Sequence, residues 1–314
     1  MLDSLPCRMD VFHPLTKERL MAFQLRKIDK PLGHEILGVD LRNLSDEDFE
    51  KIDAAYREYG VVVIRDQKLT PQDQLNFSRR FGALDRFVFD RFNMPENPEI
   101  FIVSNVIEEG RPIGMEDAGR YWHSDMWYVA KPPRGSFLYA LEVPHDGSRP
   151  LGDTCFASTR YAYETLPEDL RQQVDSLQAV FSSKKYGEYV GHTEEKAKDN
   201  IYLKDVVKAR EKIKDNTITH PLVRIHPITG KKCLHVVQGV ISEIVGLPPA
   251  ESEALVEKLV NHAIRPEAIY RHQWRVGDIV MWDNYSALHQ ANGDFKLPQR
   301  RLMHRTTLSA PLAA

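Results

Sequence analysis

The first part of the chain alternates between helical and extended hydrophobic patterns. Between Ser45 and Gly60, apolar residues recur at the three- and four-residue spacing of a helix, and acidic residues fill the first turn. Ser is a favoured N-cap and Gly a favoured terminator, so this pattern predicts a helix with both ends marked. Residues 61–64 are all apolar and predict a buried strand. Residues 70–82 predict a second helix, because they begin with Thr-Pro and end with Gly.

The rest of the chain has many short extended segments and few helical ones. The Pro-Ile-Thr-Gly segment at 227–230 predicts a hairpin, and Pro167 is predicted to divide a helical segment into two. A further helix is predicted at 249–262. The other strands are predicted at 100–106, 135–143, 152–156, 221–226, 232–237, 269–274, 279–282 and 301–308. We find no internal repeat and no clear boundary, so the pattern predicts one mixed α+β domain over residues 24–314.

Two segments differ from this pattern. Residues 1–23 mix charges with prolines and lack the apolar stretch of a signal peptide, which indicates an N-terminal extension. Residues 182–217 carry many Lys, Glu and Asp and few aliphatic side chains. Such a segment is either a solvated helical insertion, which is the simpler interpretation, or a lid over a site.

Composition narrows the class of protein. The chain is 42% hydrophobic and 28% charged, as soluble proteins are. Its net charge of −3 argues against a nucleic-acid partner. We find no apolar run of about 18 residues that would cross a membrane. The three cysteines are scattered, without a Cys-x-x-Cys pair, which favours a reducing, cytoplasmic location.

Residues 121–127 contain a His-x-Asp pair, His123 and Asp125. On a strand, positions i and i+2 face the same side, so the imidazole and the carboxylate would project together. Two His and one carboxylate with open positions are the ligands of non-haem Fe(II) oxygenases. His289, upstream of an arginine-rich strand, is the best candidate for the third ligand. For each histidine taken alone, a structural role is the simpler interpretation.

At a period of two, Arg301, Met303 and Arg305 share one face of the last predicted strand. Buried guanidinium groups need anionic partners, and Arg pairs with carboxylates through two parallel hydrogen bonds. The partners are either acidic residues of the chain or bound organic anions. Residues 85–93 mix aromatic and charged side chains, which is typical of an anion pocket or of a loop anchored to the core.

A set of motifs occurs in order along the chain: Trp122–Asp125, Gly152–Thr154, Gly277–Asp278, Trp282–Asn284, His289 and Gln299–Thr307. From about Gln24 to Leu308 the chain thereby resembles the Fe(II)/2-oxoglutarate-dependent taurine and aryloxyalkanoate dioxygenases. The resemblance implies a double-stranded β-helix, or jelly-roll, core with flanking helices. It implies an enzyme that uses Fe(II), 2-oxoglutarate and O2 to hydroxylate a small organic anion, with succinate and CO2 as coproducts.

The same resemblance implies a role for each site residue: His123, Asp125 and His289 as the catalytic iron ligands, Thr154 and Arg301 for the distal carboxylate of 2-oxoglutarate, and Arg305 for the anionic group of the substrate. From their aromatic character and place in the sequence, we expect Phe87, Phe89 and Trp127 to form an apolar wall of the substrate pocket. Analogy with the family favours a homodimer or a tetramer.

The chain departs from the taurine enzymes near the expected substrate. Phe87 and Asp90 stand where those enzymes have His and Tyr, and Gly119 stands where they have Asn. Residues 271–278 and 281–284 are more similar to the aryloxyalkanoate branch. The expected substrate is therefore an aryloxyalkanoate-like carboxylate or a sulfonate, rather than taurine itself.

Two other functions are compatible with parts of the pattern. A jelly-roll hydrolase or isomerase that uses zinc or manganese would explain the histidines and the carboxylate, but not Thr154 with Arg301. A non-catalytic small-molecule binding protein would not need every position of the metal and cosubstrate set to be filled, as it is here.

Overall fold

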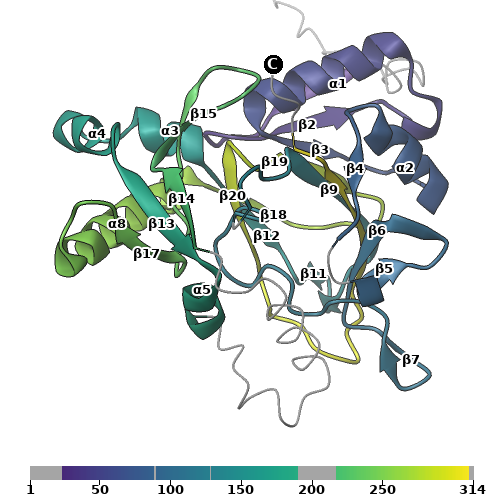
Figure 1. The fold of residues 1–314 in the computed structure, drawn as a ribbon. Coiled ribbons are helices and arrows are strands. Elements are labelled where there is room, and N and C mark those ends of the chain that lie inside the picture. The colour runs from purple at the N-terminus through teal and green to yellow at the C-terminus, as the bar shows by residue number, and fades with distance from the viewer. Residues whose placement is uncertain (1–22, 88–89, 128, 190–216, 311–314) are drawn as a thin grey trace, which may run out of the picture.

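The computed structural model describes residues 23–87, 90–127, 129–189 and 217–310, shown in Figure 1. Residues 1–22 of the expected N-terminal extension lie outside these ranges. Phe89 also lies outside them. Of the charged segment at 182–217, residues Ser183–Tyr189 form helix α5, and 190–216 lie outside.

The largest sheet in these ranges has nine strands in the order β1-β2-β3-β19-β9-β21-β6-β5, with β4 paired to β21. Its pairs are antiparallel except for the parallel pair of β2 and β3. The central strands carry the apolar runs seen in the sequence, and β3 and β19 are fully buried. The strands are β1 (Gln24–Lys27), β2 (His34–Leu37), β3 (Val61–Ile64), β4 (Leu84–Asp85), β5 (Asn93–Met94), β6 (Asn97–Ser104), β9 (Gly135–Glu142), β19 (Ile279–Asp283) and β21 (Leu302–Leu308).

A smaller sheet faces the large one. It consists of β12 (Thr154–Ser158) between β18 (Ile269–His272) and β20 (Ala287–Ala291). Phe156 of β12 is fully buried and packs with Leu138, Trp282 and Met303 of the large sheet in one apolar cluster. The next residue along β12, Ala157, belongs to a different cluster on the opposite face. The small sheet therefore separates two cores, and its inner face lies against the large sheet.

Two helices, α1 (Asp46–Tyr59) and α2 (Pro71–Arg79), cover the outer face of the large sheet (Figure 1). The predicted caps of α1 are confirmed: Ser45 Oγ accepts a hydrogen bond from Asp48 N at 3.1 Å, and Gly60 has a φ of 69°. A side chain at Gly60 would be strained and would meet Ser286. Helix α2 ends before the predicted Gly82, because its last turn tightens into i to i+3 hydrogen bonds such as Arg80 N to Phe77 O.

On the other side of the small sheet, helices and further strands form the second apolar core. The break at Pro167 is confirmed, since it separates α3 from α4, and the hairpin around residues 227–230 is confirmed as β15 and β16. These elements are α3 (Thr159–Glu164), α4 (Glu168–Val174), α8 (Pro249–Ala263), β13 (Gln178–Ser182), β14 (Thr217–Pro221), β15 (Val223–Ile225), β16 (Lys232–Leu234) and β17 (Ile241–Ile244).

Short pieces complete the fold. They are the ribbons β7 (Ile107–Glu108) with β8 (Arg111–Pro112) and β10 (His145–Asp146) with β11 (Arg149–Pro150), and the 3-10 turns Leu41–Asn43, Asp90–Phe92 and Pro266–Ala268. The structure is thus a mixture of helices and several sheets, as the hydrophobic pattern predicted. None of the helices in the described part of the chain is long and apolar enough to cross a membrane.

Phe156→Ala tests the packing of the two sheets. We expect the free energy of unfolding to fall by about 3–5 kcal/mol, because the substitution leaves a cavity that the sheets cannot close. Urea denaturation measures the change. Val276→Ala is the control, since Val276 is 61% exposed, and it should change stability by less than about 0.5 kcal/mol. An equal loss in both variants would contradict this account of the core.

His304 on β21 makes stability depend on pH. Burial lowers its pKa from 6.5 to about 4. Between these values the unfolded chain binds the proton and the folded one does not, so stability falls as the pH drops below 6.5. We expect this group to cost about 2 kcal/mol between pH 7 and pH 5. Urea denaturation at pH 7 and at pH 5 measures the difference in the free energy of unfolding. In His304→Leu this difference should be smaller by about 2 kcal/mol. His145→Asn, which changes an exposed histidine, should show the same difference as the parent.

Candidate active site

The site begins with a pairing between a loop and a strand. His123 and His289 exchange two backbone hydrogen bonds, N to O at 3.0 and 2.8 Å. This pair is an isolated bridge, so His123 lies in a loop and not on the regular strand that the sequence analysis considered. His289 belongs to β20. The pairing brings the two imidazole rings to 4.1 Å between their centroids.

Asp125 completes a cluster of three candidate metal ligands with these histidines. One oxygen, Oδ1, lies 3.9 Å from Nε2 of His123 and 3.9 Å from Nε2 of His289. The three ligand atoms lie within 4.8 Å of one another. The structure therefore brings together the two halves of the ligand set, which are far apart in the sequence.

The Asp125 carboxylate is buried and held by neighbouring side chains. Ser136 Oγ donates to Oδ2 at 2.7 Å, and Arg305 Nη1 donates to Oδ1 at 3.3 Å. The backbone N–H of Asp125 donates to Asn284 Oδ1 at 3.2 Å, and the Asn284 amide donates onward to Pro133 O. These contacts fix both the backbone and the carboxylate of this residue.

The charge states of the three residues suit metal binding. Burial lowers the pKa of His123 and of His289. Burial alone would raise the pKa of Asp125, but the Arg305 guanidinium and the hydrogen bond from Ser136 act to bring it below its ordinary value. His123 Nδ1 donates to Tyr121 O at 2.6 Å, which leaves its Nε2 as the ring nitrogen with a lone pair. Two neutral imidazoles and a carboxylate are the forms that bind a metal.

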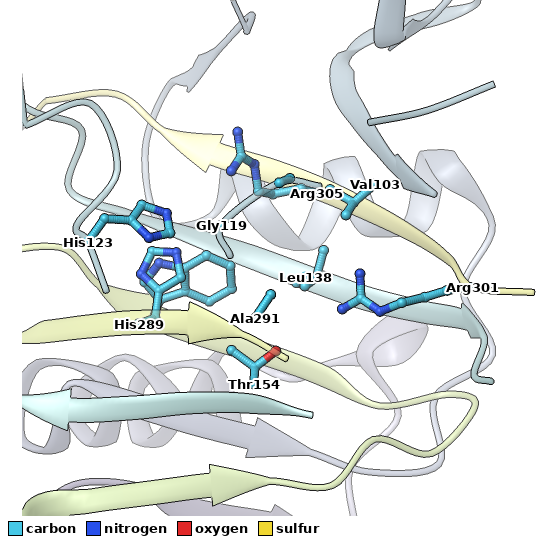
Figure 2. A pocket seen from close by; sticks show the side chains of 11 residues that line it. Val103, Gly119, His123, Leu138, Thr154, His289, Ala291, Arg301 and Arg305 are labelled. Atoms are coloured by element: carbon cyan, nitrogen blue, oxygen red, sulfur yellow. The ribbon is translucent and has the colours of Figure 1, made fainter. Parts of the chain in front are cut away.

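A pocket between the two sheets extends away from this cluster. Figure 2 shows His123 and His289 at one end and Arg301 at the other, with Thr154, Leu138 and Ala291 between them. The register explains this lining, because Thr154 pairs with Ala291, and Phe156 with His289, across β12 and β20. The whole lining consists of Val103, Ala118, Gly119, His123, Leu138, Thr154, Trp282, His289, Ala291, Arg301 and Arg305.

Thr154, between the two ends of the pocket, and Arg301, at the far end, offer hydrogen-bond donors to an anion (Figure 2). Trp274 Nε1 donates to Thr154 Oγ1 at 3.0 Å, so the Thr154 hydroxyl retains its own proton to donate. Arg301 is 3% exposed, and within the described ranges its side chain makes no ion pair and its Nε has no hydrogen-bond partner. Burial, and next the charge of Arg120, lowers the pKa of Arg301 to about 9. A buried cation of this kind favours a bound carboxylate.

The predicted substrate residues lie in different places. Arg305 lines the pocket and has its guanidinium carbon 4.7 Å from the ring centroid of Phe87 and 4.9 Å from that of Phe101. Trp127 is buried in the second core, where its ring contacts Tyr186 at 5.6 Å, and it is not among the residues that line the pocket. Phe89 lies outside the described residues.

Ser136 and Asn105 were not identified from the sequence, and Trp274 was present only within the compared segment 271–278, without a role of its own. Asn105 Oδ1 accepts from the backbone N–H of Arg301 at 2.8 Å and so positions the start of β21. No local sequence pattern distinguishes Ser136 and Asn105 from other polar residues of strands and loops. Asn284 was part of the Trp282–Asn284 motif. The motif indicated that this segment matters, but it did not predict the contact of Asn284 with Asp125.

Ser136→Ala tests the support of the metal cluster. Partners of this kind typically contribute 10- to 100-fold to metal affinity, so we expect the dissociation constant for Mn(II) to rise by about 10-fold or more. Anaerobic titration followed by electron paramagnetic resonance measures it. Ser78→Ala is the matched control, because Ser78 is equally buried but pairs with Thr306. Unchanged Mn(II) affinity in Ser136→Ala would show that the hydroxyl does not support the site.

The chain is similar to known proteins over nearly its whole length. The family model described as "Taurine catabolism dioxygenase TauD, TfdA family" matches residues 24–307. The (S)-phenoxypropionate/alpha-ketoglutarate-dioxygenase of Sphingobium herbicidovorans is 34% identical over 93% of this chain and 97% of its own length. The alpha-ketoglutarate-dependent sulfonate dioxygenase of Saccharomyces cerevisiae is 31% identical over 94% of this chain and 68% of its own length.

Among solved structures, AAD-2 in complex with Mn(II) and N-oxalylglycine aligns with a TM-score of 0.74. The alignment has 26% identity and covers 93% of this chain and 99% of that one. The family model covers nearly the whole chain, and the phenoxypropionate enzyme is similar over nearly its whole length. The chain therefore belongs to the taurine catabolism dioxygenase TauD, TfdA family.

Proposed function

We propose that this protein is an Fe(II)- and 2-oxoglutarate-dependent dioxygenase that hydroxylates a small organic anion, with succinate and CO2 as coproducts. The observation that supports this proposal most strongly is the arrangement of one pocket. His123, Asp125 and His289 lie at one end of it, and the buried guanidinium of Arg301 lies at the other. A zinc hydrolase would use the first group but has no need of the second. Membership of the family supports the same reaction.

The residues present fit iron. Both histidines direct Nε2 towards Asp125 Oδ1, and hydrogen bonding fixes the His123 tautomer that leaves this nitrogen free to bind. A 2-His-1-carboxylate set is the one that non-haem Fe(II) oxygenases use. When bound, Fe(II), O2 and the 2-oxo acid together supply oxidative decarboxylation coupled to hydroxylation of a C–H bond.

Thr154 and Arg301 fit the distal carboxylate of 2-oxoglutarate. The hydroxyl that Trp274 orients lies between the two ends of the pocket (Figure 2). The guanidinium of Arg301, which the described residues leave without an ion pair, lies at the end away from the histidines. A dicarboxylate that spans the pocket would place one end beside the metal ligands and the other on these donors. Binding would also neutralise a buried cation that the described residues leave without an ion pair.

For the substrate, we propose an aryloxyalkanoate-like carboxylate or a sulfonate whose anionic group meets Arg305. Only one contact of that guanidinium is an ion pair, the one with Asp125, and its Nε has no hydrogen-bond partner in the described ranges. Phe87 and Phe101 flank it and restrict where an anion can approach. The ring of Phe87 lies beside the Arg305 guanidinium, which supports the role expected for it in the apolar wall. For Phe89 and Trp127 the role stays a prediction.

The large and small sheets support a jelly-roll core, which we propose for residues 24–314 as a single dioxygenase domain. They face each other across one apolar cluster, and the candidate site lies between them. A cytoplasmic location, a dimeric or tetrameric assembly, and a lid formed by residues 182–217 stay predictions.

Turnover with defined cosubstrates tests the function. We expect the protein with Fe(II), O2 and 2-oxoglutarate to form succinate, and to form it faster with a suitable anion. A screen should include aryloxyalkanoates, sulfonates, alkyl sulfates and amino-acid derivatives. His123→Ala, Asp125→Ala and His289→Ala should each abolish succinate formation while leaving the fold intact, because each removes a ligand.

His145→Ala is the control for these variants, since His145 is an exposed histidine that is not among the residues that line the pocket. Circular dichroism checks that every variant is folded. Succinate formation that persists in all three ligand variants, or that requires zinc in place of Fe(II), would contradict the proposal.

A further inference from the structure

A second guanidinium lies beside the cosubstrate end of the pocket. Arg120 follows Gly119, which lines the pocket. Its guanidinium carbon is 5.2 Å from the ring centroid of Phe295, and that of Arg301 is 5.7 Å from the same centroid. Phe295 is 7% exposed. One buried phenyl ring thus has contacts with two cationic side chains, one inside the pocket and one at its border.

The absence of a side chain at Gly293 leaves room for the Arg120 guanidinium. A Cβ at Gly293 would lie 1.4 Å from Arg120 Nη1, so any larger residue there would displace the guanidinium. Gly293 does not have the positive φ that would itself require glycine. Gln290 Nε2 donates to Arg120 O at 2.9 Å, and Arg120 Nη2 donates to Glu116 O at 3.3 Å. These contacts hold the backbone and the side chain in one place.

The residues that the structure describes do not balance the charges at this end. Within the described ranges, neither Arg120 nor Arg301 forms an ion pair with a carboxylate, and Arg120 has only a carbonyl oxygen and the Phe295 ring as partners. The charge of Arg120 also disfavours the protonated form of Arg301. Two neighbouring cations repel each other, and an anion bound close to both would relieve the repulsion.

We propose that Arg120 is a further positioning residue for 2-oxoglutarate, which supplies a second positive charge to the distal carboxylate held by Thr154 and Arg301. This inference rests on the proposed function. Because Arg120 is only half-buried, its charge reaches the solvent and also attracts the dianion towards the pocket. It acts on affinity for the cosubstrate and not on the metal cluster or on the primary substrate.

Arg120→Gln tests the proposal by anaerobic calorimetric titration of 2-oxoglutarate into the Mn(II)-loaded protein. Loss of one partly exposed charge should weaken binding by about five-fold, and the difference should shrink in high salt. Arg120→Lys retains the charge and should recover most of the affinity. Arg171→Gln is the matched control, because it removes the same charge from a half-buried position on α4, and it should bind like the parent.

A second ligand separates a charge effect from a structural one. 2-Oxopentanoate has the chain length of 2-oxoglutarate but lacks the distal carboxylate, so Arg120→Gln should leave its affinity unchanged. In steady-state turnover, the KM for 2-oxoglutarate should rise while kcat and the KM for the primary substrate stay near the parent values.

Three results would overturn the inference: equal binding of 2-oxoglutarate by Arg120→Gln and the parent, equal weakening of both oxo acids, or a rise in KM confined to the primary substrate. In each of these cases the parent still binds 2-oxoglutarate, so the proposed function stands. Failure of the parent itself to bind 2-oxoglutarate would instead contradict the proposed function.

Discussion

The geometry of the site depends on two backbone hydrogen bonds between His123 and His289. They join a loop to the edge strand β20 of the small sheet, and β20 is in turn paired to β12. Phe156, opposite His289 on β12, packs against the large sheet. The positions of the two imidazoles therefore depend on the pairing of one sheet and on the packing between two sheets, and not on the flexibility of a loop.

Burial of charge is the second constraint. The Asp125 carboxylate is buried and accepts hydrogen bonds from Arg305 and Ser136, so its charge has partners before any ligand arrives. Arg301 has none among the described residues. An uncompensated buried cation costs stability, and a ligand that binds only the folded protein recovers part of this cost. The same contrast separates the roles of Arg301, which directly precedes β21, and Arg305, which lies on it, although both line the same pocket.

Much of the local structure could be predicted from the sequence. Ser45 and Gly60 mark the ends of α1, Pro167 separates α3 from α4, and the turn at 227–230 joins β15 to β16. These features depend on a few neighbouring residues, because capping, the missing N–H of proline and turn conformation are local effects. The period-two pattern of residues 301–305 is local for the same reason. Arg305 on β21 and Arg301, one residue before this strand, line one pocket as the pattern predicted.

Contacts between segments that are distant in the sequence could not be predicted from local patterns. The hydroxyl of Ser136, the amide of Asn284 and the ring of Phe295 take their roles from strand register and sheet packing, which no local pattern encodes. Trp127 is only two residues from Asp125, yet its ring packs in the second core, away from the pocket lining. The sequence by itself determined which residues can bind a metal and an anion, since this follows from their chemistry and their order. The tertiary structure alone decided which of them share a pocket and which charges are left unpaired, because burial and distance are set by packing across the whole chain.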